Sequence, residues 1–292
     1  MGVETRIRNK HASGSTENWL QNAITVIGFC WRWIGTAISF AVFGIGSLFL
    51  GIIVLPLISI VIRQDERRSR WSRAVVGAAM KGFTWFMRGV GVLRYEISGF
   101  EHVDKDKNYL ILANHPSLID VVFLLSVFPT ADCVIKEPLK KNFFTRRLMN
   151  GVDYISNEDP IEWLQKCVER LESGRSLILF PEGTRTGPDE PLCFKAGAGS
   201  VAVRAGTECL PVVISCEPTT LTKAESWYHV PDRRIFFSMQ IQPSISARAV
   251  LTDFGDERQA GRAFNQYLHG YFTSKLADSP AATQVPTLDA LG

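Results

Sequence analysis

Two short clusters of polar residues have the composition of a reaction site. In the first, the segment 114–120 with the sequence NHPSLID, His115 and Asp120 are five residues apart. A histidine oriented by a carboxylate is a common general base for removing a proton from a hydroxyl. A continuous helix would place the two side chains about 140° apart, so the pair requires the turn that Pro116 predicts. The spacing of Ser117 and Asp120 also fits a helix capping box, so a purely structural role stays open.

The second cluster is the segment 180–187 with the sequence FPEGTRTG. It offers a glycine, backbone donors, hydroxyls and an arginine that can bind an anion through two parallel hydrogen bonds. As an isolated loop it would be a turn with a solvated salt bridge. The candidate substrate-binding residues of this cluster are Phe180, Pro181, Glu182, Gly183, Thr184 and Arg185.

Both clusters follow short apolar runs that are typical of buried strands. Strands are predicted at residues 109–113, 176–180, 210–215 and 235–241. Helices are predicted at 159–172, where Asp159, Pro160, Glu162 and Gly174 supply start and stop signals, and at 256–276. This alternation predicts an α/β fold with a mixed sheet flanked by helices. Because ligands of such sheets bind beyond the carboxyl ends of strands, the two polar clusters are expected to share one site.

The N-terminal part of the chain differs from this pattern. Residues 1–18 are polar and predict a flexible arm, and residues 19–62 form a membrane segment in which 33–62 lacks any charge. A straight helix of that uncharged length would measure about 45 Å, against a hydrocarbon core of about 30 Å. The segment is therefore either a tilted span or a helical hairpin that turns at its glycine-rich middle. The candidate break points are Gly44, Gly46, Gly51 and Pro56.

Residues 63–94 carry eight basic and two acidic side chains. The positive-inside rule therefore places the rest of the chain on the cytoplasmic side of a cytoplasmic (inner) membrane. Apolar residues recur at helical spacing within 71–92, which fits a basic amphipathic interfacial helix or an ordinary core helix. Residues 95–278 are expected to form the catalytic domain, and 279–292 a disordered tail.

Composition excludes several classes of function. A net charge of +3 without a basic, aromatic-rich run excludes nucleic acid as the expected partner. The six cysteines are scattered, and the histidines other than His115 are isolated, so neither a disulfide framework nor a metal site is expected.

The N-H-x4-D and F-P-E-G-T-R motifs, in this order and about 60 residues apart, resemble those of the glycerolipid acyltransferases. This superfamily includes the 1-acylglycerol-3-phosphate and lysophospholipid acyltransferases. The resemblance extends over about residues 71–245 and adds Lys136 and Lys195 as substrate-binding candidates. It implies acyl transfer at a membrane from a thioester, acyl-CoA or acyl carrier protein, to a lysolipid hydroxyl, with no other cofactor. His115 would be the general base, Asp120 would fix its tautomer, and backbone N–H groups near Gly183 or after His115 would hold the oxyanion.

One position departs from the family. Asn157 stands where the family usually has an arginine that helps to bind the acceptor phosphate. Asparagine has no positive charge and no bidentate fork, so a weaker demand for an acceptor phosphate is predicted unless a neighbouring cation compensates. Aminolipid, glycolipid or polyene-type acceptors stay open. Two further alternatives are a thioesterase, although no G-x-S-x-G motif is present, and a non-catalytic lipid-binding protein.

Overall fold

The computed structural model describes residues 4–157, 159–188, 190–248 and 254–278, so the predicted tail at 279–292 lies outside the described residues. An eight-stranded sheet forms the centre, with the strand order β1-β7-β6-β2-β5-β3-β4 and with β8 beside β6. The strands are β1 (Leu93–Ser98), β2 (Leu110–Ala113), β3 (Asp132–Ile135), β4 (Ile155–Ser156), β5 (Leu177–Leu179), β6 (Glu208–Glu217), β7 (Ile235–Ile241) and β8 (Ile245–Ser246). All four predicted strands are confirmed, and the sheet already begins at Leu93, two residues before the predicted domain boundary.

The strand directions place the polar loops on one edge of the sheet. Strands β6, β2, β5, β3 and β4 are mutually parallel, while β7 runs antiparallel to β6 and carries β1 parallel to itself. The loops after β2 and β5 therefore leave the same edge from adjacent strands. The sequence did not predict β3 and β4, which have only four and two residues and show no clear alternation.

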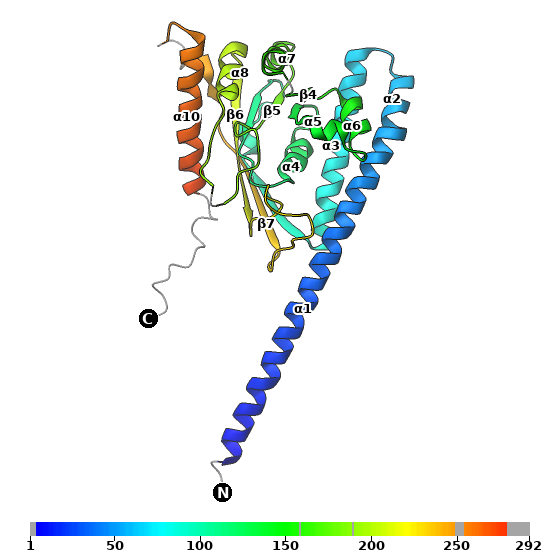
Figure 1. Cartoon of the computed structure of the whole chain (residues 1–292), viewed down its shortest axis with the longest axis vertical. Coiled ribbons are helices and arrows are strands. Elements are labelled where there is room, and N and C mark those ends of the chain that lie inside the picture. Colours follow the sequence, from blue (N-terminus) through cyan, green and yellow to red (C-terminus); the bar gives the residue numbers. More distant parts are fainter. Residues whose placement is uncertain (1–3, 158, 189, 249–253, 279–292) are drawn as a thin grey trace.

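Helices cover both faces of this sheet (Figure 1). One face packs against α3 (Asp65–Val90), α4 (Asp120–Val127) and α6 (Arg146–Val152), and the other against α7 (Pro160–Glu172), α8 (Gly197–Ala205) and α10 (Glu257–Ala277). The residues of β2 alternate between the two cores, because successive side chains of a strand point to opposite faces. The predicted mixed α/β fold is therefore confirmed.

The predicted start of α7 is confirmed in its main features. The Asp159 carboxylate accepts hydrogen bonds from the N–H groups of Ile161 and Glu162, at 2.8 and 2.9 Å. The Glu162 side chain was expected to complete a capping box, but its carboxylate instead lies 2.6 Å from Lys166 Nζ, an (i, i+4) pair that a helix surface favours. The second predicted helix corresponds to α10, with Asp256 as its N-cap.

The predicted membrane segment forms one continuous helix, as the single-span alternative expects, and the chain reverses only after it, so that this helix and α3 form a hairpin. Helix α1 (Glu4–Phe49) continues through the π-helical turn η1 (Leu50–Val54) into α2 (Leu55–Val61), and the chain reverses at residues 62–64 before α3. Residues 4–18, expected as a flexible arm, are helical, since extending an existing helix costs less than starting a new one. The hairpin turn expected at the glycines is wrong, because the helix runs straight through Gly44 and Gly46.

The π-helical turn has a local cause in Pro56 and a packing consequence at Gly51. Proline has no N–H and crowds the preceding turn, which a widened turn relieves. At Gly51 the backbone approaches α6 so closely that a Cβ would lie 2.7 Å from the backbone nitrogen of Leu148. Two of the four predicted break points therefore mark the real irregularity of this helix.

Within the described residues, one helical stretch, Thr25–Val61, is long and apolar enough to cross a membrane. One side of it contacts the rest of the protein: Trp31 Nε1 donates to the Val90 carbonyl at 2.8 Å, and the Phe40 ring lies 5.5 Å from the Trp227 ring. The other side is an exposed apolar face. Its members include Ile34, Ile38, Val42, Ile45, Phe49, Ile52, Ile53, Leu57 and Ile60.

Helix α3 joins this hairpin to the sheet. Val76, Met80 and Met87 of α3 are buried, so this side of the helix is an ordinary core helix. On the other side, Trp71 and Trp85 are exposed.

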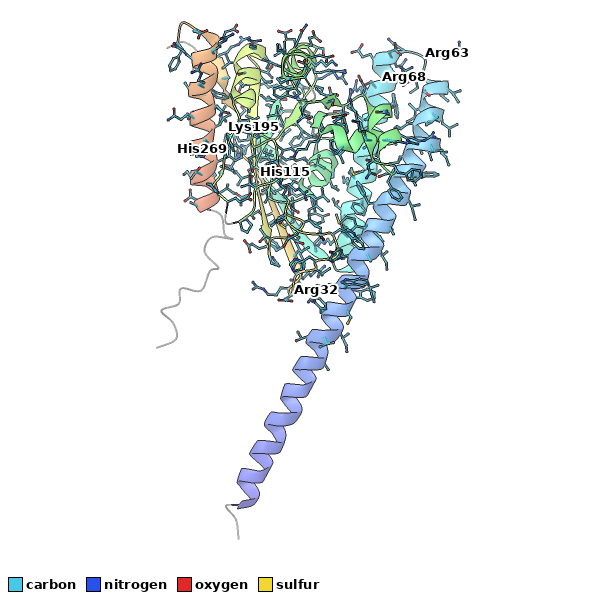
Figure 2. The ribbon with its side chains drawn as sticks, in the orientation of Figure 1. Arg32, Arg63, Arg68, His115, Lys195 and His269 are labelled. Atoms are coloured by element: carbon cyan, nitrogen blue, oxygen red, sulfur yellow. The ribbon has the colours of Figure 1, made fainter. Side chains whose placement is uncertain are left out.

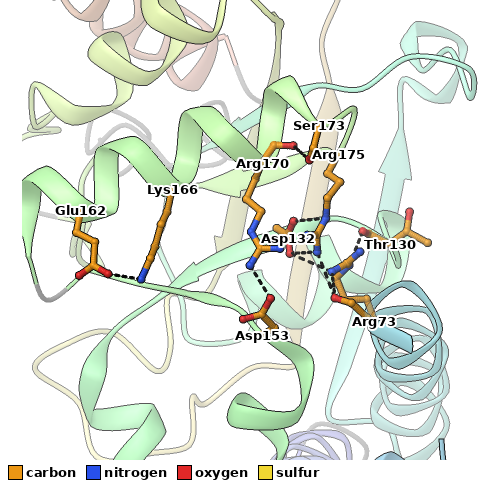
Figure 3. Close-up of polar contacts among 10 residues, drawn as sticks. Arg73, Thr130, Asp132, Asp153, Glu162, Lys166, Arg170, Ser173 and Arg175 are labelled. Atoms are coloured by element: carbon orange, nitrogen blue, oxygen red, sulfur yellow. Dashed lines mark hydrogen bonds and ion pairs between the residues drawn. The ribbon is translucent and has the colours of Figure 1, made fainter. Parts of the chain in front are cut away.

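A buried ion network adds to this packing (Figure 3). In it, Arg73 of α3 and Arg175 both lie against Asp132 at the start of β3, at 3.3 and 2.9 Å. Burial raises the pKa of Asp132 to about 6, an effect that Arg73 opposes. The network lies at the start of β3, away from the edge where the polar loops emerge.

Candidate active site

His115 and Asp120 meet where β2 ends and α4 begins. His115 Nδ1 lies 2.8 Å from Asp120 Oδ2, so the chain turns between them as the dyad requires. The Asp120 carboxylate is fully buried, whereas the His115 side chain is 18% exposed. With Nδ1 held by the carboxylate, Nε2 is the nitrogen that can exchange a proton with a substrate.

Asp120 also carries out the structural role that the sequence left open. Its Oδ2 accepts a hydrogen bond from the Ser117 N–H at 2.7 Å across the turn that leads into α4, although the N-cap of α4 itself is Ile119. Burial raises the pKa of Asp120, and the hydrogen bond with His115 opposes this effect. One carboxylate therefore fixes both the start of α4 and the orientation of the imidazole.

The FPEGTR loop packs against His115 and hydrogen-bonds its backbone. Glu182 is buried and accepts a hydrogen bond from the His115 N–H at 2.8 Å and a second from the Thr186 hydroxyl. Thr186 N–H in turn donates to the His115 carbonyl at 3.0 Å. The Phe180 ring stacks on the imidazole with 4.0 Å between ring centroids. Phe180 and Glu182, expected to bind substrate, therefore lie against the histidine itself, and burial raises the pKa of the Glu182 carboxyl.

Asn114 and the loop after β6 complete this support, and the sequence gave no separate role to either. The Asn114 side chain bonds both the N–H and the carbonyl of Ile214, at 2.7 and 2.8 Å, and so continues the β2–β6 ladder. Ser117 Oγ donates to the Thr220 carbonyl at 2.9 Å. The polar loops of three adjacent strands are therefore interlocked.

Arg185 is anchored in the same place. Its Nη1 donates to the carbonyls of Leu221 and Thr222, at 2.6 and 3.1 Å. Because a guanidinium has five N–H donors in a planar fork, this anchoring fixes its direction and leaves donors for an anion.

Four cations gather around the loop that contains Gly183. Lys136 Nζ donates to Thr184 Oγ1 at 3.2 Å, and Lys195 lies so close to Gly183 that a Cβ there would be 3.0 Å from its Cδ. Gly183 also has φ +65°, which favours glycine. The pKa of Lys136 is lowered by burial and then by the positive charges of Lys195, Lys223 and Arg185. Lys136, Arg185, Lys195 and Lys223 are called the cation cluster below.

Lys223 was not predicted, and Pro181 and Gly183 have structural roles. Lys223 follows Thr222 in the loop after β6, and only the folding of that loop over Arg185 brings it to the site. Pro181 offers its carbonyl to the Lys195 N–H at 2.8 Å. Gly183 N–H donates to the Phe180 carbonyl at 3.0 Å, so this amide is not available to an oxyanion.

Asn157 lies at the same edge but on the outermost strand. It follows Ser156 of β4, which pairs with Ile135 of β3, so Asn157 is next to Lys136 in register. Its side chain is exposed.

Figure 2 shows His115 near the centre of the molecule and Lys195 towards α8, with Arg63 and Arg68 distant at the hairpin turn. In the described part of the chain, no three His, Cys, Asp or Glu side chains come together as a metal site.

Comparison with known proteins agrees with this arrangement. Residues 94–215 match the family model named Acyltransferase. The 1-acyl-sn-glycerol-3-phosphate acyltransferase of Helicobacter pylori is 36% identical over 112 residues, which are 36% of this chain and 47% of that protein. The mouse 1-acyl-sn-glycerol-3-phosphate acyltransferase alpha is 25% identical over 221 residues, or 70% of each chain. The matches span about a third to a half of the first three relatives' length.

A solved structure shares the fold. The crystal structure of the 1-acyl-sn-glycerophosphate (LPA) acyltransferase PlsC from Thermotoga maritima matches with a TM-score of 0.59 and 21% identity, over 86% of this chain and 98% of that one. The residues matched by the family model include His115, Asp120 and the FPEGTR loop. Residues 94–215 therefore match the Acyltransferase model, and this is the resemblance that the two polar motifs predicted.

Proposed function

We propose that this chain is a membrane-bound O-acyltransferase that moves a fatty acyl group from a thioester to the hydroxyl of a phosphate-bearing lysolipid. The single observation that carries the proposal is the His115–Asp120 pair at the same sheet edge as the cation cluster. A general base and an anion site side by side suit a substrate with a reacting hydroxyl and a phosphate. The names of the relatives agree with this substrate class.

The chemistry needs no group beyond the two substrates. The acceptor hydroxyl attacks the thioester carbonyl carbon while its proton passes to His115 Nε2. Asp120 stabilises the imidazolium that forms. When the tetrahedral intermediate collapses, the C–S bond breaks and the imidazolium returns its proton to the departing thiolate. Ester and free thiol are the products, with no covalent acyl-enzyme.

The cation cluster bears on the missing arginine at position 157. An acceptor phosphate is a small dianion, and four cations from three different loops offer more positive charge than it requires. The cluster therefore favours compensation for Asn157 over the weaker phosphate demand expected from the sequence. We assign the phosphate to Lys136, Arg185 and their neighbours, and leave Asn157 outside the site.

We expect wild-type protein to prefer lysophosphatidic acid over monoacylglycerol, which lacks the phosphate. Lys136→Ala should lower kcat/KM for lysophosphatidic acid about tenfold or more, since a charge-assisted hydrogen bond contributes about 1.5–3 kcal/mol, and should change monoacylglycerol turnover little. Asn157→Arg serves as the matched variant and should leave the preference for lysophosphatidic acid unchanged.

The products are identified by mass after incubation with acyl-CoA or acyl-carrier-protein donors. Free fatty acid as the main product would indicate a thioesterase. Equal turnover of both acceptors by wild type would contradict the phosphate assignment.

The membrane setting follows from the two sides of α1. Because one side of this helix packs on α3, α6 and the loop with Trp227, lipid cannot surround it along the docked length. We infer that α1 and α2 lie in one leaflet of the cytoplasmic membrane with their exposed apolar face in lipid, while the sheet stays in the cytoplasm. The basic residues at 63–94 agree with that side.

Cysteine labelling tests this topology. In a chain with Cys30→Ser and Ser15→Cys, we expect position 15 and the exposed Cys193 to be protected from an impermeant maleimide added to intact cells. Both should react after permeabilisation, because the reagent then reaches the cytoplasmic side of the membrane, where both positions are expected to lie. Labelling of position 15 alone in intact cells would mean that the helix crosses the bilayer.

A further inference from the structure

A second apolar surface lies between the cation cluster and α1. The segment 136–147, called the aromatic turn below, contains α5 (Glu137–Lys141) and the connection to α6. Phe143 and Phe144 are 64% and 47% exposed, and Leu139 is also exposed. Adjacent exposed phenylalanines are costly in water, so such a patch indicates a partner surface.

The phenyl rings are presented by a rigid scaffold. The Asn142 side chain accepts the Phe144 N–H at 2.9 Å, and the Asn142 carbonyl accepts the Arg146 N–H at 2.8 Å. Thr145 is buried, and its hydroxyl donates to the Leu139 carbonyl at 2.7 Å. These hydrogen bonds hold the backbone that carries both exposed rings.

The charge of the aromatic turn indicates the chemistry of that partner. Five basic residues and one acidic residue give the segment a net charge of +4. The Arg146 guanidinium lies 5.9 Å from the centroid of the Phe143 ring, so charge and apolar surface are side by side. Aromatic rings flanked by cations suit the boundary between acyl chains and anionic head groups.

The location of the aromatic turn fits the same partner. The Phe144 ring lies against α1, where a Cβ on Gly44 would be 3.4 Å from it, so the exposed rings continue the exposed apolar face of that helix. At its other end the segment begins with Lys136 of the cation cluster. The aromatic turn thus connects the apolar face of α1 with the anion site.

We propose that the aromatic turn inserts Phe143 and Phe144 into an anionic lipid surface beside the cation cluster. It forms a membrane contact separate from α1 and holds the site at the level of the lipid head groups. The inference rests on the proposed membrane setting of α1, but it does not depend on the acyl-transfer chemistry.

Site-specific fluorescence tests this insertion in the full chain. An environment-sensitive fluorophore is attached to Phe143→Cys, after the exposed Cys30 and Cys193 are replaced by serine. The matched control is Ile161→Cys on α7, 80% exposed on the opposite face of the sheet, and Ile45→Cys reports on α1. The protein is reconstituted with vesicles of phosphatidylcholine alone or mixed with phosphatidylglycerol.

We expect an apolar emission signal at position 143 in the mixed vesicles, a weaker signal in phosphatidylcholine alone, and an aqueous signal at position 161. Lys140→Gln and Arg146→Gln should each lower the ratio of inserted to exposed probe about fivefold, from about 1 kcal/mol per cation near an anionic surface.

Three outcomes would contradict the proposal in different ways. An aqueous signal at position 143 with an apolar signal at position 45 would exclude the aromatic turn and leave the setting of α1 intact. Aqueous signals at both positions would exclude the membrane setting itself. An equal response at position 143 to acyl carrier protein without vesicles would identify a protein-docking surface instead.

Discussion

Alanine at position 115 is expected to lower kcat for acyl transfer by about 10²–10⁴-fold, the usual contribution of a positioned general base. The structure separates this loss from misfolding. The His115 backbone N–H and carbonyl hold Glu182 and Thr186, and alanine keeps both contacts. The measurement is product formation by purified, detergent-solubilised protein, with the thermal unfolding midpoint recorded for each variant.

His102→Ala is the matched control for this experiment. His102 is a partly exposed histidine in a short 3-10 turn after β1, and its imidazole lies 3.8 Å from the exposed Glu101 carboxylate. Its replacement should leave turnover unchanged. Near-wild-type turnover by the His115→Ala protein would remove His115 from the mechanism.

Asp120→Asn is expected to reduce kcat by about 10³–10⁴-fold for a different reason. Asp120 Oδ2 both accepts the Ser117 N–H and contacts His115 Nδ1, so an asparagine oxygen in the same place can keep both contacts. The asparagine lacks the negative charge with which Asp120 stabilises the imidazolium that forms in the transition state.

The stability of two variants distinguishes catalysis from the structural role at this position. Asp120→Asn should unfold close to wild type, whereas Asp120→Ala also loses the hydrogen bond from the Ser117 N–H and should be less stable by about 1 kcal/mol. The double variant His115→Ala, Asp120→Asn should be no slower than either single variant, because the two groups act as a unit. Additive losses in the double variant would mean that Asp120 does not act through His115.

The sequence was sufficient where local patterns have a single structural solution. Strands β2, β5, β6 and β7 and helices α7 and α10 were predicted because period and capping signals are local properties. The short strands β3 and β4 were missed, since pairing with neighbours rather than their own residues makes them strands. The hairpin alternative for residues 33–62 is wrong because glycine permits a break but does not require one, and packing on α3 and α6 keeps α1 helical.

By itself, the sequence predicted the match to the Acyltransferase model, the pairing of His115 with Asp120 and the apolar character of the N-terminal segment. Motif residues and hydropathy are written directly in the order of amino acids. Only the tertiary structure decided that Glu182 and Phe180 lie against His115, that Lys223 joins the cation cluster and that α1 is docked along one side. These contacts join segments that are far apart in the chain. They form because the carboxyl ends of parallel strands share one edge of the sheet, so the loops that follow these strands come together there.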